Sequence, residues 1–257
     1  MLKPYAVAAE GGRIVVTDPG MRAIHLFDTN VGNYRRVTRA KGEFLRSPVG
    51  AAIGPNRIYV ADSVLGKVFA FDAEGDVVAT LEGLERPTGL AYDRATGRLY
   101  VAETTMHRIS VFDEAGTRLF AFGGRGTGGT QFNFPSHLFL QGGRLYVNDT
   151  MNFRLQTFDL DGHLLSSFGT HGDGSGNFSQ PKGVGVDAVG HIYVADATFD
   201  RVQIFDPRGR YLLGFGGQGS EAGNFWLPAG VFIAGDRIYV ADSYNRRVQV
   251  FQFLGGK

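Results

Sequence analysis

The stretch Arg237–Gln252, RIYVADSYNRRVQVFQ, decides the fold, because the chain contains six related copies of it. Each copy runs through β-branched and aromatic residues to an acidic residue, then through a short loop into a second apolar run. The acidic residues are 44, 41, 46, 47 and 46 positions apart: Asp18, Asp62, Glu103, Asp149, Asp196 and Asp242. Such a period in β-type sequence is typical of a propeller with one repeat per blade. The sequence therefore predicts an all-β, six-bladed β-propeller.

Length and composition agree with a single propeller domain over residues 1–257. The repeats leave no gap for a linker, and closed all-β folds of this length often form one domain. The 26 Lys and Arg residues nearly cancel the 25 Asp and Glu residues, so no whole-molecule field draws the chain to nucleic acid or anionic membranes. The lack of cysteine excludes disulfides, thiolate chemistry and cysteine-ligated metals.

Every repeat opens with a proline and a small apolar segment, as in Pro87-Thr-Gly-Leu-Ala-Tyr. Proline is tolerated at the first residue of a strand, where its missing N–H breaks no ladder. Glycine stands third in four of the six segments, which suits an innermost strand where blades crowd around the axis. We expect four strands per blade: this inner strand, the two runs of the repeat, and an outer strand after a turn such as Glu74-Gly75.

The pattern Pro-x-Gly…Ile-Tyr-Val-Ala-Asp-Ser…Asn-x-Arg-Val-x-Val-Phe strongly resembles the NHL repeat over essentially the whole chain. The segments Phe225–Gly230 and Ala241–Arg247 are especially similar to it. The chain resembles the six-bladed NHL-type proteins of bacteria, and this resemblance implies the same fold. Proteins with this fold include RNA-binding and protein-binding modules and a few metal-dependent lyases and lactonases, so the resemblance leaves the function open.

In five repeats the acidic residue is followed five places later by a cation. These pairs are Asp62/Lys67, Glu103/Arg108, Asp149/Arg154, Asp196/Arg201 and Asp242/Arg247. A functional hypothesis would make the acids a ring of carboxylates for a cation or for acid–base chemistry. Repetition favours a structural role, because a catalytic site needs unlike residues at unlike positions. We expect each acid to hold its own loop and to pair with its own cation.

Three of the six histidines fall on one face of the predicted propeller. We call this the top face; it carries the loops between second and third strands and the connections between blades. The three are His107, His137 and His171, and His137 stands at the channel mouth where other blades have glycine. The resemblance to lyases that hold metals near the axis makes these residues the candidate ligands of an alternative, a metal-dependent lyase or lactonase. No close spacing pre-forms such a site, and we expect no cofactor.

The tips of the top-face loops carry large apolar or aromatic side chains in nearly every blade, whereas loop tips are usually polar. The candidate partner-binding residues are Leu65, Met106, Phe153, Phe199, Trp226, Tyr244 and Arg246. Some of them are expected to cover the neighbouring blade. The rest would form an apolar patch with a polar rim, which is typical of a protein-binding surface. The pattern favours a non-catalytic binding or scaffold protein that engages a protein partner.

Basic residues beside the prolines predict a cationic ring at the channel mouth: Lys3, Arg46, Arg86 and Lys182. Binding of RNA or another polyanion is therefore a second alternative. The net charge of +1 and the self-neutralised Asp/Arg loops argue against a strong electrostatic binder.

Blade six has no room for an outer strand, because only residues 253–257 follow its third strand. We expect three strands there, with the Arg247–Phe251 edge open to a strand from a partner or a second copy. Because only Met1–Lys3 precede the first inner strand, we also expect the native chain to carry an upstream segment, which could hold an export signal. The chain itself shows neither a signal-peptide layout nor an apolar run that could span a bilayer, and the compartment is left open.

Overall fold

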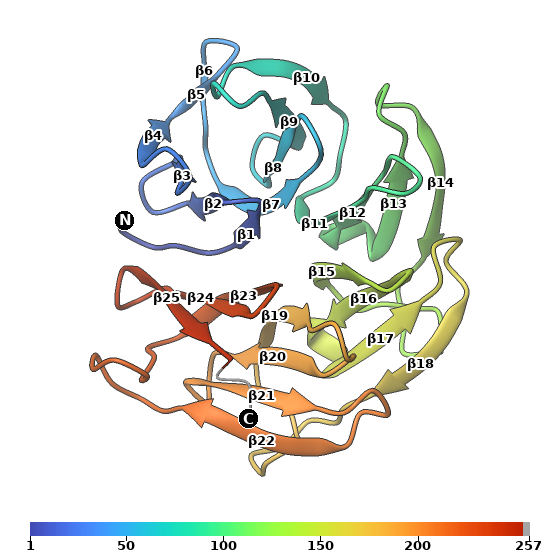
Figure 1. The fold of residues 1–257 in the computed structure, drawn as a ribbon. Helices are drawn as coiled ribbons and strands as arrows, with labels where there is room; N and C mark the ends of the chain where they lie inside the picture. The colour runs from blue at the N-terminus through green and yellow to red at the C-terminus, as the bar shows by residue number, and fades with distance from the viewer. Residues whose placement is uncertain (254–257) are drawn as a thin grey trace.

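A computed structural model describes residues 1–253 and contains six antiparallel blades arranged in a ring around a central axis (Figure 1). The first three blades contain β1 (Val7–Glu10), β2 (Arg13–Asp18), β3 (Ala23–Asp28) and β4 (Asn33–Val37); β7 (Pro48–Ile53), β8 (Ile58–Asp62), β9 (Lys67–Phe71) and β10 (Val77–Leu81); and β11 (Pro87–Asp93), β12 (Arg98–Glu103), β13 (Arg108–Phe112) and β14 (Arg118–Gly123). The last three contain β15 (Pro135–Gln141), β16 (Arg144–Asp149), β17 (Arg154–Phe158) and β18 (Leu164–Phe168); β19 (Pro181–Val186), β20 (Ile192–Asp196), β21 (Arg201–Phe205) and β22 (Tyr211–Gly216); and β23 (Pro228–Ala234), β24 (Arg237–Asp242) and β25 (Arg247–Gln252). The predicted six-bladed propeller is confirmed.

The remaining elements are short and lie in the connections. A two-stranded hairpin, β5 (Arg39–Ala40) and β6 (Glu43–Phe44), links blades one and two, and the repeat pattern did not predict it. Single 3₁₀ turns, η1 (Thr104–Met106) and η2 (Thr150–Asn152), form two of the top-face loops. Within residues 1–253, no helix is long and apolar enough to cross a membrane.

Burial of the strands follows their place in the blade. All five residues of β8 and of β20 are buried, because these second strands are covered by neighbouring blades on both faces. Outer strands are covered on one face only, so β14 alternates between exposed and partly buried positions along its last four residues. The Val, Ile, Tyr and Phe residues of the repeats suit these half-covered and fully covered pleated surfaces.

Glycine in the inner strands allows the blades to approach one another at the axis. A Cβ on Gly50 would lie 1.7 Å from the carbonyl oxygen of Thr88 in the next blade, and one on Gly183 would lie 2.3 Å from the amide nitrogen of Val231. No side chain can be accommodated at such distances without moving a blade. The crowding inferred from the Pro-x-Gly pattern is confirmed.

Three long connections are anchored by a buried phenylalanine from the motif Phe-Gly-x-x-Gly…Phe-x-x-Pro. These anchors, Phe132, Phe178 and Phe225, have no exposed surface. Each packs against the glycine at the start of its connection; a Cβ on Gly169, for example, would lie 2.5 Å from the Phe178 ring. The motif therefore folds each connection back onto its own blade and holds the top-face loops in place.

Blade six has three strands among residues 1–253, as predicted, and β25 has no partner there on its outer edge. The junction between blades six and one is closed by the same kind of hydrogen bond as the junction between blades three and four. Ser243 Oγ donates a hydrogen bond to the carbonyl oxygen of Pro4 at 2.5 Å, just as Thr104 Oγ1 donates to that of Pro135 at 2.8 Å. Strand addition or self-association at the β25 edge stays a prediction.

Candidate binding site on the top face

The acidic residues that end the second strands are internal parts of the loops. All six are fully buried. Asp62 shows the pattern: its carboxylate accepts backbone N–H groups from Arg46, Ser47, Val64 and Leu65 at 2.7 to 3.2 Å. It thereby ties the connection that enters a blade to the loop that leaves the second strand. The expected structural role of the acids is supported, and these carboxylates are not available as a ring at the surface.

The predicted acid–cation pairs form in three of the five blades. Glu103/Arg108, Asp149/Arg154 and Asp242/Arg247 meet at 2.8 to 2.9 Å. The prediction is wrong for Asp62/Lys67 and Asp196/Arg201. Lys67 Nζ instead contacts Glu43 at 2.9 Å and Glu82 at 3.5 Å, and Arg201 Nε lies 3.5 Å from the carbonyl oxygen of Phe199. Backbone amides already satisfy the two acids, so neither needs its cation.

Two rings from blades on opposite sides of the propeller stack on each other near its axis. Tyr5 of blade one stacks on His137 of blade four with ring centroids 5.5 Å apart. His137 is 9% exposed, and its Nε2 atom is buried without a hydrogen-bond partner in residues 1–253. Burial and the nearby Lys182 charge lower the pKa of His137 to about 3, so the imidazole is neutral. The sequence analysis missed Tyr5, although it is the only aromatic residue among the six that follow the inner-strand prolines.

Cations surround this pair of rings. Lys182 Nζ lies 5.6 Å from the centre of the Tyr5 ring, and Lys3 Nζ lies 5.2 Å from that of Tyr244. Burial and the charge of Lys3 lower the pKa of Lys182. Burial raises the pKa of Tyr5, and the charge of Arg86 opposes that rise. Arg86 and Lys182 therefore lie near Tyr5, and Lys3 lies near Lys182; that these cations form a binding mouth stays a prediction.

Arg46 is exposed at the same face, but no contact joins its side chain to Tyr5 or His137. Its backbone amide binds Asp62, which holds the residue in the connection between blades one and two. Of the residues predicted at the mouth, His137, Lys182, Arg86 and Lys3 lie close together, and Arg46 lies outside this cluster.

The candidate partner-binding residues all keep exposed surface. Trp226, Tyr244 and Met106 are 48, 46 and 44% exposed, and Arg246 is exposed as well. Leu65, Phe153 and Phe199 are partly buried. Leu65 and Phe153 also pack against the hydrophobic core. This agrees with the expectation that some of the candidate residues cover a neighbouring blade. The expected partial exposure is confirmed; that these residues bind a partner stays a prediction.

Aromatic contacts join the tip residues to the mouth. The Trp226 and Tyr244 rings lie 5.6 Å apart, and Tyr244 in turn carries Lys3 over its face. Trp226, Tyr244, Lys3, Lys182 and Tyr5 therefore form a series of aromatic and cationic side chains that runs from blade six to the axis. We call this series the aromatic–cationic track.

Comparison with known proteins agrees with this architecture. The family profile for the SMP-30/gluconolactonase/LRE-like region matches residues 138–213, and that for the NHL repeat matches residues 84–112 and 225–251. These matches and the six-bladed ring decide the family. The chain is an NHL-type propeller. A search of curated protein sequences finds no match to this NHL-type propeller.

Solved structures with a similar fold are remote in sequence. Hydrazine synthase of Kuenenia stuttgartiensis is 12% identical, with a TM-score of 0.72 over 100% of this chain and 97% of that chain. A catalytically inactive virginiamycin B lyase from Staphylococcus aureus with quinupristin is 13% identical, with a TM-score of 0.68 over 98 and 85% of the two chains. U3-55K is 15% identical, with a TM-score of 0.70 over 98 and 78%. At these identities the likeness shows the fold alone.

The three candidate metal ligands of this NHL-type propeller do not meet. His107 is buried, and its Nδ1 atom accepts a hydrogen bond from the Phe134 amide at 3.2 Å. His171 is exposed and packs on Phe153, whereas His137 stacks in the channel. Residues 1–253 contain no group of three or more His, Asp or Glu side chains that could hold a metal ion. The residues at the mouth therefore do not fit the metal centre that the lyase or lactonase alternative requires.

Proposed function

We propose that this NHL-type propeller is a non-catalytic binding module whose top face holds an acidic segment of a protein partner. The observation that carries the proposal is the aromatic–cationic track. Large exposed aromatic side chains lie beside cations on a face where the six repeat carboxylates are buried and already hydrogen-bonded.

Apolar contact area supports a protein as the partner. Val64, Met106, Met151, Trp226 and Tyr244 on the top-face loops are between 44 and 69% exposed. Trp, Tyr and Met are enriched in the cores of protein interfaces, and buried Trp and Tyr are frequent energetic hot spots.

Unpaired positive charge supports the acidic character of the segment. Among residues 1–253, no ion pair involves Lys3, Arg46, Arg86, Lys182 or Arg246. The partly desolvated Lys182 amine stands beside Lys3 without a counter-ion, and a carboxylate of the partner would relieve this repulsion. Because the net charge is only +1, the attraction is local and works after contact rather than over long range.

Photo-crosslinking in the native cell tests the proposal. A crosslinking amino acid replaces Met106 or Tyr244 on the top face, or Val189 as a control, which is 71% exposed in a turn on the opposite face. We expect one protein to be captured from both top-face positions and not from Val189. Capture of nuclease-sensitive RNA instead, with strongly salt-dependent retention, would replace the proposal by the polyanion alternative.

Binding of the captured protein, once purified, tests the named residues. Trp226→Ala is expected to weaken the affinity about 30-fold, as for a hot-spot aromatic residue worth about 2 kcal/mol. Lys182→Gln is expected to weaken it about tenfold, which corresponds to one charge-assisted contact. The matched controls are Leu212→Ala on β22 and Arg208→Gln in the turn before it, both exposed and outside the top face. Equal effects of the test and control variants would contradict the proposal.

A further inference from the structure

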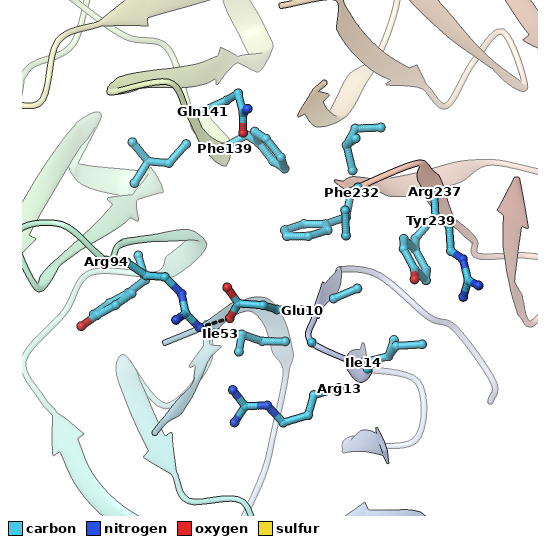
Figure 2. A pocket seen from close by; sticks show the side chains of 18 of the residues that line it. Glu10, Arg13, Ile14, Ile53, Arg94, Phe139, Gln141, Phe232, Arg237 and Tyr239 are labelled. Carbon is cyan, nitrogen blue, oxygen red and sulfur yellow. Dashed lines mark hydrogen bonds and ion pairs between the residues drawn. The ribbon is translucent and has the colours of Figure 1, made fainter. Parts of the chain in front are cut away.

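A cavity of about 730 Å³ opens on the face opposite the top face, around the turns between first and second strands (Figure 2). Blades one, two, three, four and six contribute to its wall. Its volume lies in the range of small-molecule sites, which are commonly found at the mouths of closed β folds. We call it the lower cavity; no sequence motif pointed to it.

The inner end of the lower cavity is apolar and aromatic. Phe139 of blade four packs edge to face against Phe232 of blade six, with the centres of the two rings 5.2 Å apart. Beside them, Tyr92, Ile53 and Leu140 line both the lower cavity and a recess of about 80 Å³ that extends between blades two, three and four. A flat ring entering the cavity would meet aromatic faces and edges here, an arrangement that favours aromatic ligands.

Most charges around the lower cavity are already engaged. Glu10 pairs with Arg94 across blades one and three, as Figure 2 shows. Arg13 donates to the carbonyl oxygens of Gly54 and Pro55 at 3.4 and 3.3 Å. These contacts fix the rim between blades one, two and three.

The acids of the rim are engaged too. Asp93 accepts hydrogen bonds from the Ala95 amide and the Thr96 hydroxyl within its own turn. Asp236 accepts one from Gln252 Nε2 at 2.8 Å. These donors are neutral groups, so both carboxylates keep their negative charge, and neither forms an ion pair with Arg237 within residues 1–253.

Three polar groups in the lining stay without a partner in the part of the chain that the structure describes. They are the Arg237 guanidinium, the Tyr239 hydroxyl and the Gln141 amide. Arg237 and Tyr239 are two positions apart on β24 and so project from the same face of that strand. A cation and a hydroxyl donor thus stand together at one side of the lower cavity, where they suit a carboxylate or sulfonate oxygen.

We propose that the lower cavity is a binding site for a small anionic aromatic molecule. Its ring lies against Phe139 and Phe232, its anionic group contacts Arg237 and Tyr239, and Gln141 donates to a polar substituent. The site lies on the face opposite the proposed partner surface, so it does not rest on the function proposed above.

Two fluorescent probes with the same ring system test the site. 8-Anilinonaphthalene-1-sulfonate is the anionic probe, and N-phenyl-1-naphthylamine is its neutral counterpart. The wild-type chain is expected to bind one anionic probe per molecule. Arg237→Gln should weaken that binding at least tenfold and leave binding of the neutral probe within twofold, because only the charged contact is lost. Arg144→Gln is the matched control, since Arg144 holds the equivalent place at the start of β16 and does not line the cavity.

Gln141→Trp narrows the lower cavity beside Phe139, which lies two positions away on β15, and should weaken binding of both probes, with folding checked by a cooperative unfolding transition. The top-face change Lys182→Gln should leave both probes unaffected. No binding of the anionic probe would overturn the proposal, as would equal losses in Arg237→Gln and Arg144→Gln. If Gln141→Trp does not fold, the comparison of Arg237→Gln with Arg144→Gln still tests whether the anionic probe binds in the lower cavity.

Discussion

Replacing Asp149 by alanine is expected to destabilise the propeller by about 3 kcal/mol, and the contacts of the carboxylate explain this magnitude. The side chain is fully buried and accepts hydrogen bonds from the Asn133 amide at 2.6 Å and from Arg154 Nε at 2.8 Å. Asn152 and Gln156 donate to it as well. These two side chains and Arg154 also reach backbone carbonyls of the preceding connection, but Asp149 is the only acceptor within residues 1–253 for the Asn133 amide.

The expected loss has two parts. A partly buried backbone amide left without an acceptor costs about 2 kcal/mol, and loss of the charge-assisted bond from Arg154 adds about 1 kcal/mol. The matched control is Asp161→Ala. The Asp161 side chain is 67% exposed and pairs with Arg98 at 2.9 Å, and an exposed pair of this kind contributes about 0.5 kcal/mol or less.

Urea unfolding, followed by circular dichroism and by Trp226 fluorescence, measures both changes by linear extrapolation. Coincident transitions by the two probes establish that the comparison is valid. A loss for Asp149→Ala no larger than that for Asp161→Ala would refute the structural role of the buried acids. Unchanged stability with lost partner binding would instead mark Asp149 as a functional residue.

Two further predictions concern the channel and the axis. Because the folded chain keeps His137 neutral down to about pH 3 while an unfolded histidine takes up its proton near pH 6.5, stability should fall as the pH drops through this window. His137→Phe should remove that part of the loss, and urea midpoints measured between pH 7 and pH 4 check it; an unchanged slope would contradict the assignment. Gly183→Ala should lower the melting temperature more than Gly142→Ala, since a Cβ at Gly183 would meet the next blade at 2.3 Å whereas one at Gly142 meets nothing within 4 Å. Gly142 has a φ of +56°, so its variant measures backbone strain alone, and equal losses would count against crowding at the axis.

The outcome for the acid–cation pairs shows how far a repeat pattern can be extended. Repetition correctly predicted that the acids are structural, because every blade needs the same connection tied to the same loop. It failed for Lys67, whose amine contacts Glu43 of the β5–β6 hairpin. That hairpin belongs to one connection only and has no counterpart in the repeat, so periodicity carries no information about it.

The amino-acid sequence by itself determined the six blades and the order of their strands, because these depend on contacts within one repeat or between consecutive repeats. Only the tertiary structure decided the interior of the channel. Tyr5 meets His137 from blades one and four, and Phe139 meets Phe232 from blades four and six. The ring brings together side chains that no local pattern relates, and it thereby sets both the cationic mouth on the top face and the lower cavity on the other.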